Sequence, residues 1–417
     1  MKVVSFITEY NPFHFGHKYH LEKSLEISGA THSIALMSGS FLQRGEPSLV
    51  DKWTKAKMAV ENGVDLVLEL PFIYACQTAE LFALGGVRIL ESLNIVDYLV
   101  FGSERGNLQP LDHIAQVLVE EPKDYRKALK SYLDEGLSFP AARSLALEDY
   151  FKERNPEKIE GYDYKEILRQ SNNILGIEYL KALKKIHSKI KPLTIKRVGS
   201  DYKEERLKSN FASATAIRKG ILEKGLGSIR DYVPTYTYKL LEDFYIKYKA
   251  FNDLDNYLPI IKYLLLTMGP AEISSYLDVE AGLENRLVEK SFSSRTMDQL
   301  IDSISTRRYP KTRIQRILIH LLMDLKAEMV ESYYNSQVPY IRFLAANKKG
   351  LELLKLIKER SQIPILNKFA HYERLLDESF HPFIQCERKA TDLYYLGLGI
   401  VDYNNMDYKI SPYIKRD

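Results

Sequence analysis

Short apolar strands alternate with helical segments through the first hundred residues of this 417-residue chain. Segments such as Leu49–Glu61 and Thr78–Ser92 have the apolar spacing of helices. Between such segments, β-branched apolar runs are expected to form four strands, at Val3–Thr8, Ser33–Met37, Val64–Leu68 and Tyr98–Phe101. Strands that alternate with helices pair as a parallel sheet with helices on both faces. The sequence therefore predicts an α/β fold, in which ligands bind at the carboxyl ends of the strands.

A boundary near residue 225 separates this α/β region from the rest of the chain. Residues 107–170 have mostly helical and charged patterns, and a fifth strand at Leu193–Val198 follows an amphipathic helix at Ile174–Ile186. Beyond Gly220 helical patterns dominate and no alternation of strands with helices continues. We expect an α/β domain at 1–225 and a largely helical C-terminal domain at 226–417.

The composition is that of a globular protein in a reducing compartment. Hydrophobic residues make up 45% and charged residues 27%, which excludes a disordered chain. Cys76 and Cys386 lie too far apart in the sequence for a pair motif, so we expect neither a disulfide framework nor a cysteine zinc site. No apolar run is long enough for a signal sequence or a membrane span. We therefore expect a cytoplasmic protein without a membrane partner.

One short segment, residues 307–316, has five cations and no acidic residue. The net charge is +4, and the excess lies entirely within residues 201–417. A helix that begins after Pro310 would place an apolar face toward the core and a stripe of Arg313, Arg316 and His320 on another face. This stripe is expected to follow an RNA backbone, although a solvated helix face explains it equally well. The candidate RNA-binding residues are Arg307, Arg308, Lys311, Arg313 and Arg316.

The first predicted strand leads directly into a His-x-Gly-His motif. His14, Gly16 and His17 stand at the turn into a helix that begins at about Gly16. Free N–H groups and the positive dipole end of a helix bind phosphate, and a glycine there lets a nucleotide approach closely. Imidazoles so placed stabilise charge that develops during nucleotidyl transfer. The alternative is that His14, His17 and His20 are helix-surface residues or ligands of a divalent metal.

Two further loops follow the second and fourth strands. In the loop at Ser38–Pro47, Arg44 is suited to hold a phosphate or a carboxylate, and Gln43 to orient a second substrate. In the loop at Phe101–Gly106, Gly102 offers bare backbone to a base or ribose. An ordinary surface loop or turn would explain either segment.

Later segments offer further polar groups to a nucleotide. Asn172 and Asn173 stand at the start of a helix, where capping alone would account for them. Arg197 and Val198 end the predicted fifth strand. A second phosphate cradle is predicted at the start of another helix, from Ser213, Thr215 and Arg218.

Together these motifs resemble the nucleotidyltransferase superfamily, whose HxGH motif and later ISSTxxR-like motif bracket the nucleotide. The full spelling is closer still to the bacterial tRNA(Met) cytidine acetate ligase family. The segments that carry this resemblance are Glu9–His17, Ser40–Pro47, Phe101–Glu104 and Asn172–Tyr179.

This resemblance implies a Rossmann-like nucleotidyltransferase domain and a defined reaction. ATP and acetate would give acetyl-adenylate and pyrophosphate, and the acetyl group would pass to N4 of the wobble cytidine of elongator tRNA(Met). Magnesium is implied by the triphosphate, and no residue is expected to be a metal ligand. The implied catalytic residues are His14, His17, Arg44 and Gln43. The implied ATP site comprises Ile7, Thr8, Glu9, Tyr10, Asn11, Pro12, Phe13, His14, Phe15, Gly16, His17, Lys18, Tyr19, His20, Gly102, Asn172, Asn173, Arg197, Val198, Ser213, Thr215 and Arg218.

Two other functions fit parts of the sequence. A small-metabolite adenylyltransferase would use the same His-x-Gly-His chemistry but has no need of a basic helical domain. A non-catalytic, nucleotide-sensing RNA-binding protein would have no need of both phosphate cradles. We therefore expect ATP, acetate and tRNA(Met) as partners and no DNA. The sequence identifies neither a proton acceptor for the cytosine nor the oligomeric state.

Overall fold

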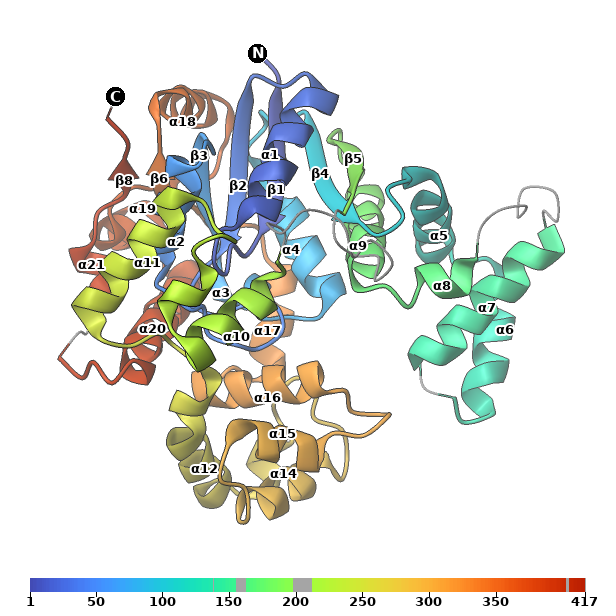
Figure 1. The fold of residues 1–417 in the computed structure, drawn as a ribbon. Helices are drawn as coiled ribbons and strands as arrows, with labels where there is room; N and C mark the ends of the chain where they lie inside the picture. The colour runs from blue at the N-terminus through green and yellow to red at the C-terminus, as the bar shows by residue number, and fades with distance from the viewer. Residues whose placement is uncertain (138, 155–162, 198–211, 403–404, 417) are drawn as a thin grey trace.

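A central sheet of eight strands organises the computed structural model, which describes residues 1–137, 139–154, 163–197, 212–402 and 405–416 (Figure 1). The strand order is β5-β4-β1-β2-β3-β6-β7, and β8 pairs with β6. All pairs are parallel except β3 with β6. The strands are β1 (Val3–Thr8), β2 (His32–Ser38), β3 (Leu66–Leu70), β4 (Tyr98–Ser103), β5 (Lys191–Lys196), β6 (Ile341–Ala346), β7 (Ile365–Leu366) and β8 (Tyr413–Ile414).

Both faces of the sheet are buried, because successive residues of a strand point to opposite faces. Val3 and Ile34 belong to one buried cluster, whereas their neighbours Val4 and Ala35 belong to the other. Helices α1 (Phe15–Ser28) and α2 (Lys52–Glu61) add Leu21 and Trp53 to the second cluster. On the first face lie α3 (Phe72–Ala75), α4 (Ala79–Ser92) and α9 (Ser171–Lys185). The prediction of an α/β sheet covered on both faces is confirmed.

The predicted element boundaries agree closely with the structure. The β1 strand has the predicted bounds, and the other three early strands differ by at most two residues. The fifth strand ends at Lys196, so Arg197 follows it, and Val198 lies outside the described residues. Gln170, rather than Ser171, is the residue before α9, so Asn172 and Asn173 lie in the first turn of that helix.

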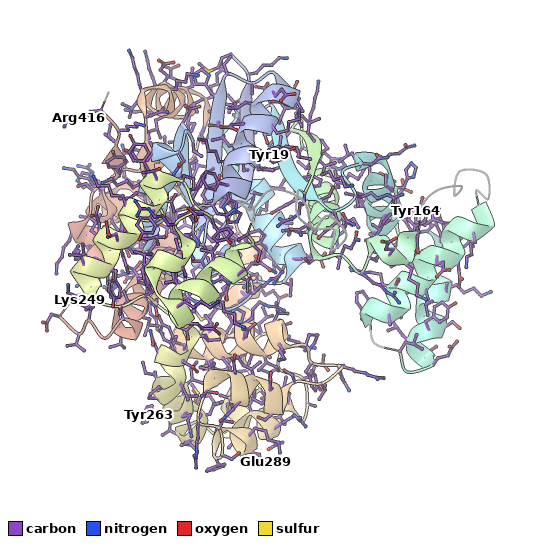
Figure 2. The ribbon with its side chains drawn as sticks, in the orientation of Figure 1. Tyr19, Tyr164, Lys249, Tyr263, Glu289 and Arg416 are labelled. Carbon is purple, nitrogen blue, oxygen red and sulfur yellow. The ribbon has the colours of Figure 1, made fainter. Side chains whose placement is uncertain are left out.

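A helical arm is inserted in the chain between β4 and β5, which pair directly in the sheet. Its helices α6 and α7 extend away from the sheet, and Tyr164 in the arm lies far from Tyr19 on α1 (Figures 1 and 2). The arm replaces a short crossover with a projecting surface beside the carboxyl edge of the sheet. It comprises α5 (Leu108–Glu120), α6 (Lys123–Asp134), α7 (Phe139–Arg154) and α8 (Tyr164–Ile167).

The C-terminal half is mostly helical, as predicted, but the sequence analysis missed its three strands. The β6 strand pairs with β3, so residues on both sides of position 225 belong to the same sheet. A single apolar run of six residues has no periodicity that distinguishes a strand from a helix. The longer helices here are α10 (Ala214–Lys224), α11 (Thr235–Tyr248), α12 (Leu258–Thr267), α14 (Leu283–Ser291), α15 (Met297–Ile304), α16 (Lys311–Met323), α17 (Ala327–Asn335), α18 (Lys348–Arg360) and α20 (His381–Gly397). Short helical turns lie at α13 (Pro270–Ile273), α19 (Tyr372–Leu375), α21 (Met406–Lys409), η1 (Leu226–Ile229), η2 (Leu254–Tyr257), η3 (Phe369–His371) and η4 (Glu378–Phe380).

Buried charges join the two halves of the chain. The Lys52 Nζ lies 2.8 Å from both Glu69 Oε1 and Asp407 Oδ1. Arg342 lies 3.1 Å from Glu69 Oε2 and 2.7 Å from Asp407 Oδ1. All four side chains are buried, so each charge depends on the others for compensation.

Within the described residues, no helix is long and apolar enough to cross a membrane.

The predicted cationic stripe on α16 is not at the surface. Ile314 and Leu318 lie in the core as expected, but Arg316 and His320 are buried as well. The His320 Nε2 lies 2.8 Å from the Cys76 carbonyl oxygen, and Arg313 binds the Asp278 carbonyl and Glu280. The spacing of apolar and basic residues along α16 does not show that this helix packs on two sides. Of the five candidate RNA-binding cations, only Arg307, Arg308 and Lys311 are exposed.

Burial of His320 predicts a loss of stability in acid. Burial lowers the pKa of His320 to about 4, below its ordinary value of 6.5, so the unfolded chain takes up this proton first as the pH falls. This contribution to stability is complete above about pH 6.5 and is lost toward pH 4, amounting to roughly 3 kcal/mol. The variant His320→Gln should therefore show a flatter pH dependence of unfolding free energy, measured by urea unfolding at several pH values. The exposed residue His187 provides the control: His187→Asn should keep the parental slope, and an equal slope for His320→Gln would contradict the assignment.

Candidate active site

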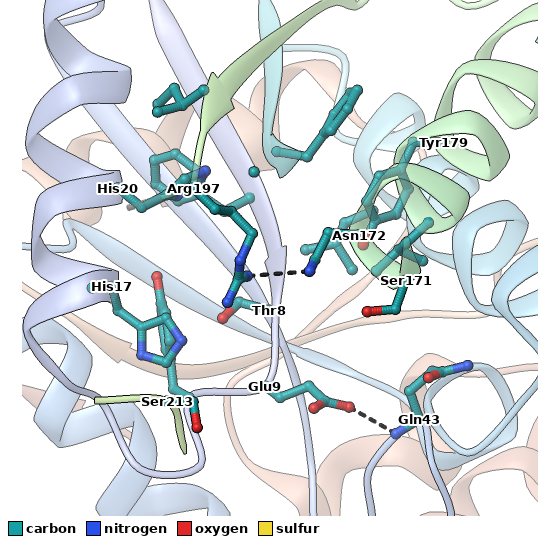
Figure 3. Close-up of a pocket in the computed structure, with 18 of the residues that line it drawn as sticks. Thr8, Glu9, His17, His20, Gln43, Ser171, Asn172, Tyr179, Arg197 and Ser213 are labelled. Carbon is teal, nitrogen blue, oxygen red and sulfur yellow. Dashed lines mark hydrogen bonds between the residues drawn. The ribbon is translucent and has the colours of Figure 1, made fainter. Parts of the chain in front are cut away.

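A cavity of about 670 Å³ opens at the carboxyl ends of β1, β4 and β5 (Figure 3). Its walls come from the loop after β1, the first turn of α1, the N-terminus of α9 and the segment after β5. The loop after β2 and the helix α16 contribute further lining residues. The cavity therefore lies where a parallel sheet of this kind binds its ligand.

The His-x-Gly-His segment forms the N-terminal cap of α1. His14 Nδ1 accepts a hydrogen bond from the Gly16 N–H at 3.0 Å, and His17 Nδ1 accepts one from the His14 N–H at 3.3 Å. The two rings stack with centroids 3.8 Å apart. A Cβ atom on Gly16 would lie 2.8 Å from His14 Cε1, so glycine is required for the imidazole to fold back over the helix end. The capping contacts thus fix both rings at the cavity wall.

These histidines are neutral at pH 7. Burial, followed by the charge of Arg197, lowers the pKa of His14 and of His20 to about 4. Burial and the neighbouring cationic groups hold the pKa of His17 well below its usual range. In both His14 and His17 the Nδ1 atom is the acceptor of a backbone hydrogen bond, which assigns the proton to Nε2. Two N–H donors are therefore available to an anion beside the N-terminus of α1.

The wall opposite α1 is built around the start of α9. Arg197 Nη1 donates to Asn172 Oδ1 at 3.1 Å (Figure 3). Glu104 accepts from the Asn172 side chain at 2.6 Å and from the Asn173 N–H at 2.8 Å, so it caps the helix through the loop after β4. A Cβ on Gly102 would lie 3.2 Å from Arg197 Cγ, which explains the glycine at this position. Asn173 is wholly buried and supports the wall without lining the cavity.

The loop after β2 is held from several sides. Its Gln43 N–H donates to Glu9 Oε1 at 2.8 Å, and Gln43 Nε2 donates to the Gln77 carbonyl at 2.8 Å. Arg44, next in sequence, is exposed at the cavity wall. The predicted pair of Gln43 and Arg44 therefore does line the cavity, although the Gln43 amide is already bonded to backbone.

Arg218 ties the loops together and does not line the cavity. Its guanidinium donates to the Asn11 carbonyl at 3.0 Å and to Glu46 Oε1 at 2.8 Å. Of the predicted second phosphate cradle, Ser213 lines the cavity, whereas Thr215 is exposed on α10 outside it. Ser213 also caps α10 by accepting from the Ala216 N–H at 3.2 Å.

Lys55 supports the site and was not singled out by the sequence analysis. Its Nζ donates to the Ser38 and Gly39 carbonyls, each at 2.8 Å, and to the Glu9 carbonyl at 3.3 Å. Burial lowers the pKa of Lys55 to about 7. A lysine within a helical pattern gives no sequence signal of such a role, because surface lysines have the same spacing.

The structure gathers most of the predicted site residues around one cavity. Those that line it are Ile7, Thr8, Glu9, Tyr10, His14, Gly16, His17, Tyr19, His20, Gln43, Arg44, Gly102, Asn172, Arg197 and Ser213. Those predicted that do not line it are Asn11, Pro12, Phe13, Phe15, Lys18, Asn173, Thr215 and Arg218. The residues that the prediction missed are mainly apolar, together with the polar residues Ser171, Lys196, Thr312 and Arg316.

The cavity combines a positive wall with an apolar one. Among the residues that the structure describes, its lining includes one carboxylate, Glu9, and four cations, namely Arg44, Lys196, Arg197 and Arg316. Phe101, Leu175 and Tyr179 supply apolar surface at the α9 side. Within the part of the chain that the structure describes, no cluster of three or more histidine, cysteine or carboxylate side chains could hold a metal ion. This arrangement suits a ligand with a planar apolar part and several negative charges.

Comparison with known proteins agrees with this site. Residues 1–408 match the family model described as HIGH Nucleotidyl Transferase. A tRNA(Met) cytidine acetate ligase of Thermoanaerobacter sp. (strain X514) is 43% identical over 415 residues, with 100% of both chains covered. One from Clostridium perfringens (strain ATCC 13124) is 41% identical over 417 residues, also with both chains fully covered.

Solved structures agree as well. A crystal structure of Thermotoga maritima TmcAL bound with alpha-thio ATP superposes with a TM-score of 0.92 at 33% sequence identity, and 100% of each chain is covered. The apo form of that protein gives a TM-score of 0.93. With the family model, the full-length relatives and the shared fold in agreement, this chain belongs to the tRNA(Met) cytidine acetate ligase family of HIGH nucleotidyltransferases.

Proposed function

We propose that this enzyme joins acetate to the N4 atom of the wobble cytidine of elongator tRNA(Met) at the expense of ATP. The observation that carries the proposal is the pair of neutral imidazoles, His14 and His17, fixed over the N-terminus of α1 in a cavity with four cations. An acetate oxygen attacks the α-phosphorus of ATP, the bond to pyrophosphate breaks, and acetyl-adenylate forms. The cytidine N4 then attacks the acetyl carbon, AMP leaves, and one N4 proton passes to solvent.

The residues support this chemistry by position and charge. The Nε2–H groups of His14 and His17 and the N-terminus of α1 meet the phosphate oxygens, where charge grows as pyrophosphate departs. Ser213 and Arg197 also line this cavity, Ser213 at the start of α10 and Arg197 just after β5. Gly102 and Tyr179 offer the adenosine a flat, partly apolar surface near the start of α9. Mg²⁺ enters as part of the substrate, carried by the triphosphate.

The tRNA is assigned to the surface formed by the C-terminal residues 226–417. The exposed cations Arg307, Arg308 and Lys311 lie just before and at the start of α16. Arg308 pairs with Glu280, and Lys311 pairs with Asp302. Exposed ion pairs such as these contribute little stability, so a phosphate can replace the carboxylate at small cost. The inward contacts of Arg313 and Arg316 remove them from this surface. A tRNA substrate also places the enzyme in the cytoplasm.

The reaction itself is tested by nucleoside mass spectrometry. Unmodified elongator tRNA(Met), incubated with the protein, ATP, magnesium and acetate, should acquire N4-acetylcytidine. The product should be absent when either ATP or acetate is omitted, because the acetyl-adenylate needs both. Acetylation that instead required acetyl-CoA, or no acetylation at all, would contradict the proposed reaction.

The role of the histidines is tested by His17→Ala. Loss of one preorganised donor to a developing negative charge lowers turnover by about 10²–10³-fold. Acetate-dependent ATP–pyrophosphate exchange should fall by that factor, while circular dichroism stays unchanged. Glu22 is exposed on the same helix and outside the cavity, so Glu22→Ala should exchange at the parental rate. Parental exchange by His17→Ala would remove this imidazole from the reaction.

The tRNA surface is tested by the double variant Arg307→Ala/Lys311→Ala. Each lost phosphate contact should lower the magnitude of the slope of log affinity against log salt by about one. Filter binding at several salt concentrations should therefore show weaker binding and a shallower slope, with acetate-dependent pyrophosphate exchange intact. Lys358→Ala, on the exposed face of α18, is the matched control. An unchanged slope in the double variant would move the tRNA to another surface.

A further inference from the structure

We propose that Arg316 binds the carboxylate of acetate and holds it for attack on ATP. This inference rests on the proposed function and deepens it by identifying the acid-binding residue. The sequence pattern placed Arg316 on an RNA-binding stripe, but the structure places it at the cavity. Thr312, one helical turn earlier on α16, lines the cavity with it.

Arg316 is fixed in position by its backbone. Gly45, with a φ of +79°, packs so closely that a Cβ there would lie 2.4 Å from the Arg316 backbone nitrogen. One turn further along α16, His320 lies 2.8 Å from the Cys76 carbonyl oxygen. The helix is therefore held against the loop after β2 on one side and the segment before α4 on the other. Side chains at this junction are prepositioned for a ligand.

The guanidinium of Arg316 is only partly satisfied, because it pairs with Asp278 but leaves Nε without a hydrogen bond. Arg316 is only 8% exposed, and its Nε atom is buried without a hydrogen bond. Its nearest carboxylate oxygen, Asp278 Oδ2, lies 3.6 Å from the guanidinium, beyond hydrogen-bond distance. The adjacent Arg313, by contrast, donates to the Asp278 carbonyl and to Glu280. A buried arginine with unused donors is costly, and a planar carboxylate matches its fork with two parallel hydrogen bonds.

The position of Arg316 favours acetate over the triphosphate. In Figure 3 His17 and Ser213 lie on one side of Glu9, and Gln43 lies on the other. Arg316 packs against Gly45 of the loop that contains Gln43. In-line displacement requires the attacking oxygen and the departing pyrophosphate on opposite sides of the α-phosphorus. With pyrophosphate at the histidines, the carboxylate belongs beside Arg316.

The neighbouring surface suits a methyl group. Ala79 and Phe82, at the start of α4, line the same cavity. The Gln43 amide donates to the Gln77 carbonyl, which places the start of α4 beside the loop after β2. A small acid with an apolar tail is thereby matched by a cation and an apolar wall. No proton moves when the carboxylate attacks, so Arg316 binds and orients without acid–base chemistry.

The test compares two affinities in one set of variants. For the parent enzyme, Arg316→Gln and Arg316→Lys, the KM for acetate is measured by ATP–pyrophosphate exchange and the Kd for ATP by calorimetry without acetate. We expect Arg316→Gln to raise the KM for acetate by at least about tenfold, because charged hydrogen bonds are lost, with the Kd for ATP within about twofold. Arg316→Lys keeps the charge but loses the fork, so its KM should lie between the two. Arg313→Gln, with its partners on Asp278 and Glu280, is the matched control and should keep the parental KM.

Each outcome has a distinct meaning. A raised Kd for ATP with an unchanged KM for acetate would overturn the proposal and assign Arg316 to the phosphates. An unchanged value of both would also overturn it. A parent enzyme that binds ATP but shows no acetate-dependent exchange would instead refute the proposed function, and the acetate assignment with it. If Arg316→Gln fails to fold, Arg316→Lys is judged by the same criterion.

Discussion

A buried lysine holds together the two strand ends on which the site is built. Lys55 donates to carbonyl oxygens at the end of β2 and to the Glu9 carbonyl just after β1. The carboxyl ends of parallel strands present carbonyls that no following strand residue satisfies, so a buried donor is required there. Burial lowers the pKa of Lys55 to about 7, because desolvation disfavours the charged form of its side chain. The loop with Gln43 and the turn into α1 therefore share one anchor.

At the same edge of the sheet, hydrogen-bond donors and positive charges come from different side chains. The imidazoles of His14 and His17 are held neutral by burial and by the cation Arg197, so they contribute N–H donors without adding a further positive charge. Arginines and Lys196 provide the charge that attracts a polyanion. A bound triphosphate would offset the field of Arg197, so the ligand itself relieves part of the cost of assembling this wall.

The sequence predicts most accurately what is determined locally. The bounds of β1, the start of α1 and the joint position of His14 and His17 follow from strand and cap patterns that span a few residues. The contacts of Arg218 and Arg316 did not follow from the sequence, because Glu46 lies 172 residues from Arg218 and Arg316 lies on a helix that is buried on two sides. The apolar residues of an amphipathic helix identify one buried face. A cation on the opposite face has the same spacing in the sequence whether that face is buried or exposed to solvent. The β6 strand was missed for a related reason, since its partner β3 is remote in sequence.

The two halves of the chain therefore form one catalytic unit. The N-terminal half supplies the nucleotide wall, but the opposite wall needs Thr312 and Arg316 from α16, and the sheet needs β6. Lys52 and Glu69 of the first half pair with Asp407 and Arg342 of the second as well as with each other, so separation would remove one partner from each of these buried charges. Because α16 follows directly from the exposed basic residues at Arg307–Lys311, the helix that lines the acid-activating cavity begins at the surface assigned to tRNA. With acetate and tRNA bound as proposed, activation and transfer of the acetyl group would share this helix, which would keep the reactive adenylate close to its acceptor.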